Sequence, residues 1–382
     1  MIILVLGNGF DLAHDLPTKY SHFLDFIKMY KDVEQKELTS DYEKEVQKKV
    51  DKLKMRNDRI AIEMQDIFMH HNRLMGHFLD VYTERCIEGK DGWIDFESEI
   101  ADIVKTFDEA CKYVKDKTEK NDDCTLPDYV YFKLAPFVFG DRDYPKDKLY
   151  KFHSEFLEEQ AKCLLNDLNR ITRLFEIYLY EYVEGIDTKL RIPEIYKIEK
   201  KIDAVLSFNY TDTYRRLYRE AESVNCCFIH GKANIDSDVK NCNLVLGIDE
   251  FLEGNRKDTD NKFIWFKKFY QRIYKETSTE YIDWLEDDIE EQADKEEKLP
   301  LYIYFYGHSL DITDKDILYK LIMHENAVVR IFYYSKAEMG KLITNLTKII
   351  GQDNLIHMTR GRDRKIEFIP SSEARQEVFC KI

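Results

Sequence analysis

The chain has 382 residues, 44% of them hydrophobic and 13% aromatic, a composition that excludes an intrinsically disordered protein. Its formal net charge of -15 disfavours a general binder of nucleic acid or of anionic membranes, because phosphate groups are repelled at long range. No apolar run reaches the roughly 20 residues of a membrane span and no signal peptide is visible, so we expect a cytoplasmic protein without membrane contact. None of the eight cysteines forms a CxxC pair, so we expect reduced thiols and no bound metal.

The predicted elements indicate a Rossmann-like α/β fold with a mostly parallel sheet. Residues 2–6 form a continuous apolar run, typical of a strand that is buried on both faces. Apolar residues then recur at helical spacing over 19–199, which predicts a mostly helical insertion after the first strand. About seven strands are predicted: Ile2–Leu6, Asp203–Ser207, Cys226–Ile229, Asn243–Leu246, Leu301–Tyr306, Val328–Tyr333 and Lys365–Phe368. Predicted helices between them are Thr213–Ser223, Phe263–Lys275, Lys315–His324 and Lys336–Ile350. We expect residues 1–18 and 200–382 to form the core.

The first strand ends in the turn Gly7-Asn8-Gly9-Phe10-Asp11. Its glycines allow a sharp turn and a close approach of the backbone to a phosphate group. Ligands of parallel sheets bind beyond the carboxyl ends of the strands, which favours a nucleotide site here. The third glycine of the GxGxxG motif is missing, and an ordinary turn between a strand and a helix is the alternative.

Two later turns carry polar side chains at predicted strand ends. Asn209 and Thr211 follow the strand at 203–207, where they either contact a ligand or cap the next helix. His230 and Gly231 follow the strand at 226–229. A histidine there suits proton transfer near neutral pH, whereas a buried, hydrogen-bonded histidine is the commoner case.

The fourth turn is Gly307-His308-Ser309-Leu310-Asp311. Its small residues favour close approach of a ligand, and helix capping is the alternative. Because four such turns would meet at one edge of the sheet, together they predict one site. A separate acidic pair, Asp95 and Glu97, either binds metal or activates water, or its members cap a helix or form salt bridges.

The opening segment GNGFDLAHDLPTKYSHF resembles the AbiH family, bacterial proteins associated with abortive infection, in which phage-infected cells stop growing or die. The resemblance rests on residues 8–12, 16–18, Tyr20 and Phe23. It continues through the later segments WIDFE, SFNYTDTY, IHGK and GHSLD, in that order. It implies an antiphage effector, with a phage protein as its trigger, and leaves open whether the chain forms homo-oligomers. Phe10, Thr18 and Tyr20 join the candidate site through this motif.

A looser resemblance is to sirtuin-like domains that bind and cleave NAD. It implies that Gly7 and Gly9 cradle the diphosphate of NAD, that Asn209 orients the attacked carbon or a water, and that His230 is the general base or contacts a ribose hydroxyl. It assigns the distal ribose to Gly307, Ser309 and Asp311. The chain lacks the zinc-binding cysteine quartet of sirtuins, so hydrolysis of NAD is a better analogy than deacylation.

Three hypotheses follow. The first is an effector that binds NAD, or a related nucleotide, and hydrolyses its nicotinamide glycosidic bond, a reaction that needs positioning and one mild base. The second is a metal-dependent nuclease that uses Asp11, Asp95 or Glu97. The third is a non-catalytic, nucleotide-sensing module that recognises a phage protein.

Overall fold

The computed structural model describes residues 1–31, 41–56, 58–88, 94–120, 125–140, 152–188, 190–218, 224–252, 254–362, 364–371 and 376–377. The chain forms two compact units. The first consists of Met1–Thr18, Leu179–Ala233 and Glu276–Ile382, and the second of Lys19–Tyr178 and Asn234–Lys275. No described helix has the length and apolar character needed to cross a membrane.

The first unit is built on a six-stranded sheet of order β4-β3-β1-β5-β6-β7, in which every neighbouring pair is parallel. Its strands are β1 (Ile2–Leu6), β3 (Ala204–Ser207), β4 (Asn225–Phe228), β5 (Leu301–Tyr306), β6 (Ala327–Tyr333) and β7 (Ile366–Pro370). A separate antiparallel pair joins β2 (Leu190–Arg191) to β8 (Gln376–Glu377). The predicted parallel α/β architecture is confirmed.

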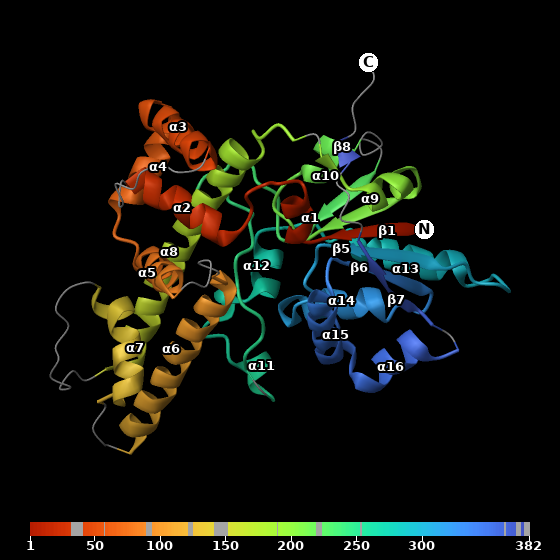
Figure 1. The fold of residues 1–382 in the computed structure, drawn as a ribbon. Helices are drawn as coiled ribbons and strands as arrows, with labels where there is room; N and C mark the ends of the chain where they lie inside the picture. The colour runs from red at the N-terminus through yellow and green to blue at the C-terminus, as the bar shows by residue number, and fades with distance from the viewer. Residues whose placement is uncertain are drawn as a thin grey trace. The chain divides into compact units, whose positions relative to one another are not determined.

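Helices cover both faces of this sheet (Figure 1). One face packs against α13 (Tyr281–Gln292), α14 (Lys315–Ile322), α15 (Lys336–Ile350) and α16 (Gln352–Arg360). The other packs against α1 (Asn8–Ala13), α9 (Pro193–Ile198) and α10 (Thr213–Leu217). The central strand β1 is apolar throughout because it contributes Ile3 and Val5 to one core and Leu4 and Leu6 to the other.

The second unit is helical. Its helices are α2 (Tyr20–Lys31), α3 (Asp41–Met55), α4 (Arg59–Met69), α5 (Arg73–Ile87), α6 (Phe96–Glu119), α7 (Asp128–Phe139), α8 (Ser154–Ile177), α11 (Arg256–Thr259) and α12 (Lys268–Tyr274). The long helix α8 packs against α4, α5, α6 and α7. Residues 234–275, which follow the β4 turn, also belong to this unit.

The predicted strand Asn243–Leu246 is wrong, and the sheet has six strands, not seven, among the described residues. The segment is buried, but its backbone is hydrogen-bonded by the Gln271 side chain and not by a neighbouring strand. Gln271 Oε1 accepts from the Leu246 N–H at 3.1 Å, and Gln271 Nε2 donates to the Leu246 carbonyl at 3.1 Å. Since the amide satisfies both backbone groups, the apolar segment is stable without entering a sheet.

Candidate functional site

Four turns meet at the carboxyl edge of the sheet in the first unit. They follow β4, β3, β1 and β5, which are consecutive neighbours in the sheet. Leu6, the last residue of β1, is in register with Ser207 of β3 and Tyr306 of β5, and Ser207 is in register with Phe228 of β4. The strands therefore end at the same level, and the four turns lie along one edge.

The turns after β1 and β5 pack backbone against backbone. The N–H of Gly7 donates to the Tyr306 carbonyl at 3.1 Å, and the N–H of Gly9 donates to the Gly307 carbonyl at 2.8 Å. Gly307 has φ +66°, and a Cβ there would lie 2.2 Å from the Phe10 nitrogen. The glycines thus serve a contact between two turns. In this conformation, the donors proposed to hold a diphosphate bind the β5 turn instead.

Asp11 is a buried carboxyl group on α1, with 1% of its surface exposed. Its Oδ2 accepts from the Thr211 hydroxyl at 2.5 Å, and Thr211 in turn accepts from the Thr213 hydroxyl at 3.1 Å. Its Oδ1 is buried without a hydrogen-bond partner among the described residues. Burial raises the pKa of Asp11 to about 6, and the nearby groups of Thr211, Thr213 and Asn209 oppose the rise. Asp11 therefore titrates in the range that suits an acid or base.

Asn209 lies between the β1 turn and this carboxyl group. Its Nδ2 donates to the Gly7 carbonyl at 3.1 Å. Neither Asn209 nor Thr211 caps α10, whose first turn has no side-chain capping bond, so the capping alternative is wrong for both residues. Both line a cavity beside Asp11 of about 10 Å³, which is roughly the room needed for one water molecule.

A second cluster forms around Asp314, in the short 3₁₀ helix Ile312–Asp314. His230 Nε2 lies 3.1 Å from Asp314 Oδ1, and His308 Nε2 lies 4.0 Å from Asp314 Oδ2. His308 Nδ1 accepts from the Leu310 N–H at 2.9 Å, which leaves the proton of a neutral ring on Nε2, toward the carboxylate. The Phe208 ring packs against both histidines, with its centroid 5.5 Å from that of His230 and 4.3 Å from that of His308.

The two clusters lie over opposite faces of the sheet edge. Phe208 belongs to the core that packs α14 on one face, whereas Phe10 and Tyr214, which line the cavity of Asp11, belong to the core on the other face. Asn209 lines that cavity and His230 does not. Asn209 and His230 were expected to act together. The structure instead places them in separate clusters, each with its own partners.

Asn8 and Thr18 are joined, because the Thr18 hydroxyl donates to Asn8 Oδ1 at 2.5 Å. Asp311 caps the 3₁₀ helix Ile312–Asp314, which was the alternative to ligand binding, because its side chain accepts from the Thr313 N–H at 3.1 Å. Ser309 is exposed, and its carbonyl accepts from Asn345 Nδ2 at 2.9 Å.

Gly231 is buried, with φ +80°. Tyr20 belongs to the second unit, where its ring stacks on Phe96 with centroids 4.2 Å apart.

Sequence reasoning did not select His308 or Asp314. The only signal for His308 in the sequence is its position directly after a strand and a glycine. No pattern in the sequence points to Asp314. It lies beside His230 only because the segments that follow β5 and β4 meet at the same edge of the folded sheet.

The acidic pair in the helical unit has structural partners. Asp95 caps α6 by accepting from the N–H groups of Glu97 and Ser98. Glu97 Oε2 lies 2.7 Å from the buried Lys268 Nζ. Over the part of the chain that the structure describes, no three histidine, cysteine or acidic side chains form a group that could hold a metal ion. The pair therefore follows its alternative, because one residue caps a helix and the other forms a salt bridge.

A family model described as bacteriophage abortive infection AbiH matches residues 3–335. The chain belongs to the AbiH family. Membership in this family associates the chain with abortive infection, the response to bacteriophage that the opening motif predicted. No curated protein and no solved structure gives a match. The sirtuin-like resemblance has no support from the family match, so NAD binding by this AbiH chain stays a prediction.

Proposed function

We propose that this AbiH protein is an antiphage effector that binds NAD, or a related nucleotide, at the carboxyl edge of the sheet and hydrolyses its nicotinamide glycosidic bond. The observation that carries the proposal is the buried Asp11, whose pKa of about 6 and position beside Asn209 suit a general base. This edge is also where parallel α/β sheets bind ligands.

In the proposed reaction, a water attacks the anomeric carbon of the nicotinamide ribose while the bond from carbon to nitrogen breaks. Nicotinamide leaves with the electron pair, and Asp11 takes the proton of the water, so that the products are nicotinamide, ADP-ribose and a proton. The Asn209 amide orients the water or the anomeric carbon. His230, positioned by Asp314, contacts a ribose hydroxyl from the other side of the edge. The transition state resembles an oxocarbenium ion, so positioning and one mild base suffice.

A nucleotide needs more room than the cavity beside Asp11 offers. We place the effect of the phage trigger at the contact between the β1 and β5 turns. Separating Gly9 from Gly307 releases the backbone N–H groups of the first turn, which then hold the diphosphate. Until that separation occurs, the closed contact between the two turns keeps the effector inactive in uninfected cells.

The test incubates the full chain with NAD, in extracts of uninfected and of phage-infected cells, and measures nicotinamide and ADP-ribose by mass spectrometry. We expect product only after infection, and a loss of about 100-fold or more in Asp11→Asn and Asn209→Ala. The matched control is Asp15→Asn, at an exposed position with φ +57°, which asparagine tolerates. Absence of both products under every trigger, with protection retained in Asn209→Ala, contradicts the proposal.

The close packing of the two turns favours a second candidate, a nucleotide-sensing module without catalysis. It predicts ligand binding by calorimetry without turnover. It also predicts that Asn209→Ala and His230→Ala still protect cells. The nuclease hypothesis has less support, because Asp95 caps α6 and Glu97 pairs with Lys268. It predicts metal-dependent cleavage of RNA or DNA on a gel.

A further inference from the structure

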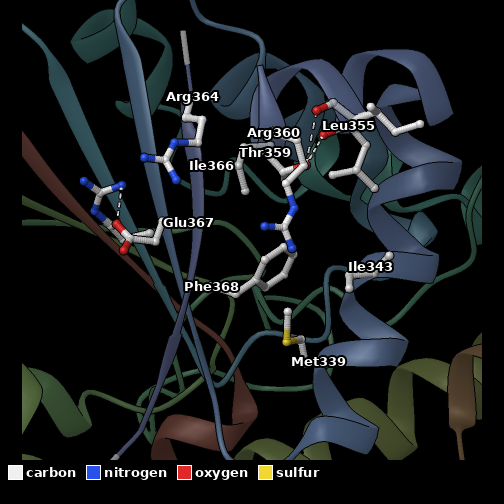
Figure 2. A pocket seen from close by; sticks show the side chains of 11 residues that line it. Met339, Ile343, Leu355, Thr359, Arg360, Arg364, Ile366, Glu367 and Phe368 are labelled. Atoms are coloured by element: carbon white, nitrogen blue, oxygen red, sulfur yellow. Dashed lines mark hydrogen bonds and ion pairs between the residues drawn. The ribbon is translucent and has the colours of Figure 1, made fainter. Parts of the chain in front are cut away.

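The edge strand β7 borders a groove in the first unit, away from the carboxyl-edge turns. The groove has a volume of about 570 Å³, within the range of known ligand sites, and is lined by residues of β6, β7, α15 and α16. Figure 2 shows Arg360 and Leu355 reaching from α16 toward Phe368 of β7, with Met339 and Ile343 of α15 beside them.

The floor of the groove is aliphatic, with Phe368 as the only aromatic ring among the residues that line it. Ile343 and Ile356 are 37% and 54% exposed, although both are large apolar side chains. Neighbouring apolar groups that stay in contact with water are typical of an interaction site rather than of a core.

Arginine side chains surround this floor. Arg330 pairs with Glu367 at 3.0 Å, and Figure 2 shows Arg360 and Arg364 on either side of β7. Neither the Arg360 nor the Arg364 guanidinium has an ion pair or hydrogen bond with the described residues. Because the chain as a whole carries a net charge of -15, this local positive charge favours an acidic ligand.

The backbone of β7 offers hydrogen bonds along the same groove. The Val329 N–H donates to the Lys365 carbonyl, and the Ser371 N–H donates to the Tyr333 carbonyl. Odd-numbered residues of β7 therefore bond β6, and the backbone groups of Ile366 and Phe368 point outward. In the described part of the sheet, β7 has no neighbour on that side. Pro370 has the same outward parity, and an edge strand tolerates its missing N–H.

We propose that this groove binds an extended acidic peptide of a partner protein by β-strand addition to β7. Main-chain bonds form at Ile366 and Phe368, alternate apolar side chains of the peptide pack on the aliphatic floor, and its carboxylates pair with Arg360 and Arg364. A single-stranded nucleic acid fits less well, because stacking of bases requires several aromatic rings. This site is independent of the proposed reaction at the carboxyl edge.

The experiment measures binding of the full chain to a labelled peptide of about ten residues that alternates valine and glutamate, by fluorescence anisotropy. We expect Arg360→Glu and Arg364→Glu each to weaken binding by about tenfold or more. The matched control is Arg362→Glu, which makes the same change at an exposed residue that does not line the groove. Amide exchange at Ile366 and Phe368 should slow when the peptide binds.

Any one of five outcomes overturns the proposal. The peptide fails to bind at about 1 mM, the weak limit of specific recognition. A valine–lysine peptide or a single-stranded oligonucleotide binds as tightly. Arg362→Glu weakens binding as much as Arg360→Glu, or exchange at β7 does not change. Unfolding midpoints of the three variants separate loss of binding from loss of structure.

Discussion

The Thr211 hydroxyl donates a 2.5 Å hydrogen bond to the buried carboxylate of Asp11, from a turn that lies 200 residues away in the sequence. The bond joins the turn after β3 to α1, directly after β1. It satisfies one carboxylate oxygen, and the other is buried without a hydrogen-bond partner among the described residues. Asp11 also lines a cavity of single-water size. A carboxyl group in this position is costly to ionise, and that cost can be measured.

Substitution Asp11→Asn should stabilise the protein at neutral pH. The pKa of Asp11 is about 6 when folded and 3.8 as a model value, so the folded state binds the additional proton between these values. The contribution of Asp11 to stability is therefore complete below about pH 4 and is lost as the pH rises through 6. The variant should gain up to roughly 3 kcal/mol at pH 7 relative to pH 4, read from urea unfolding. A gain that does not vary with pH contradicts the assignment, and Asp15→Asn should show no such gain.

Substitution Gly307→Ala should destabilise the first unit by roughly 3 kcal/mol or more. Alanine at φ +66° is strained, and its Cβ would lie 2.2 Å from the Phe10 nitrogen. The control is Gly340→Ala within α15, where a Cβ meets nothing within 4 Å and alanine should stabilise the helix by up to about 1 kcal/mol. Thermal unfolding of both variants checks the pair. Equal midpoints would show that the turns do not pack as described.

Substitution Arg173→Lys should destabilise the helical unit by about 3 to 5 kcal/mol. The guanidinium is fully buried and bonds both carboxylate oxygens of Glu63 at 3.0 Å and Glu176 at 2.6 Å. Lysine cannot reproduce this planar set of donors. Arg170→Lys, at a more exposed pair with Asp66, should change the free energy of unfolding by less than about 1 kcal/mol. If both variants unfold alike in urea, the buried network contributes little.

Tyr20 tests whether the family motif extends into a ligand site. Its ring stacks on Phe96, and Phe96 stacks on Phe78 with centroids 4.0 Å apart. Tyr20→Ala should lower the free energy of unfolding of the helical unit by about 2 kcal/mol, whereas Tyr20→Phe keeps the stack and most of the stability. Urea unfolding and nucleotide binding are measured on both. Normal stability of Tyr20→Phe with loss of nucleotide binding would restore a ligand role.

The parallel sheet was predictable because its strands are continuous apolar runs that end in glycine or polar residues. Even the bounds of α15 were predicted, since Ser335 caps its start and Gly351 follows its end. The segment Asn243–Leu246 has the same composition as a strand, and only the distant Gln271 decides otherwise. The four turns could be assigned to one edge, but not the face on which each side chain lies. The face on which a side chain lies separates Asn209 from His230. It depends on tertiary packing, since Phe208 joins the core on one face and Tyr214 the core on the other.

The contact between the turns after β1 and β5 also limits which substitutions the sequence can accept during evolution. At Gly9 and Gly307, an added side-chain carbon would meet backbone atoms of the opposite turn. A larger residue at one position cannot be compensated by a smaller one at the other, because glycine is already the smallest residue. Any relative that keeps this contact must therefore keep both glycines. The pair, almost 300 residues apart in the sequence, marks which homologues share this arrangement of turns.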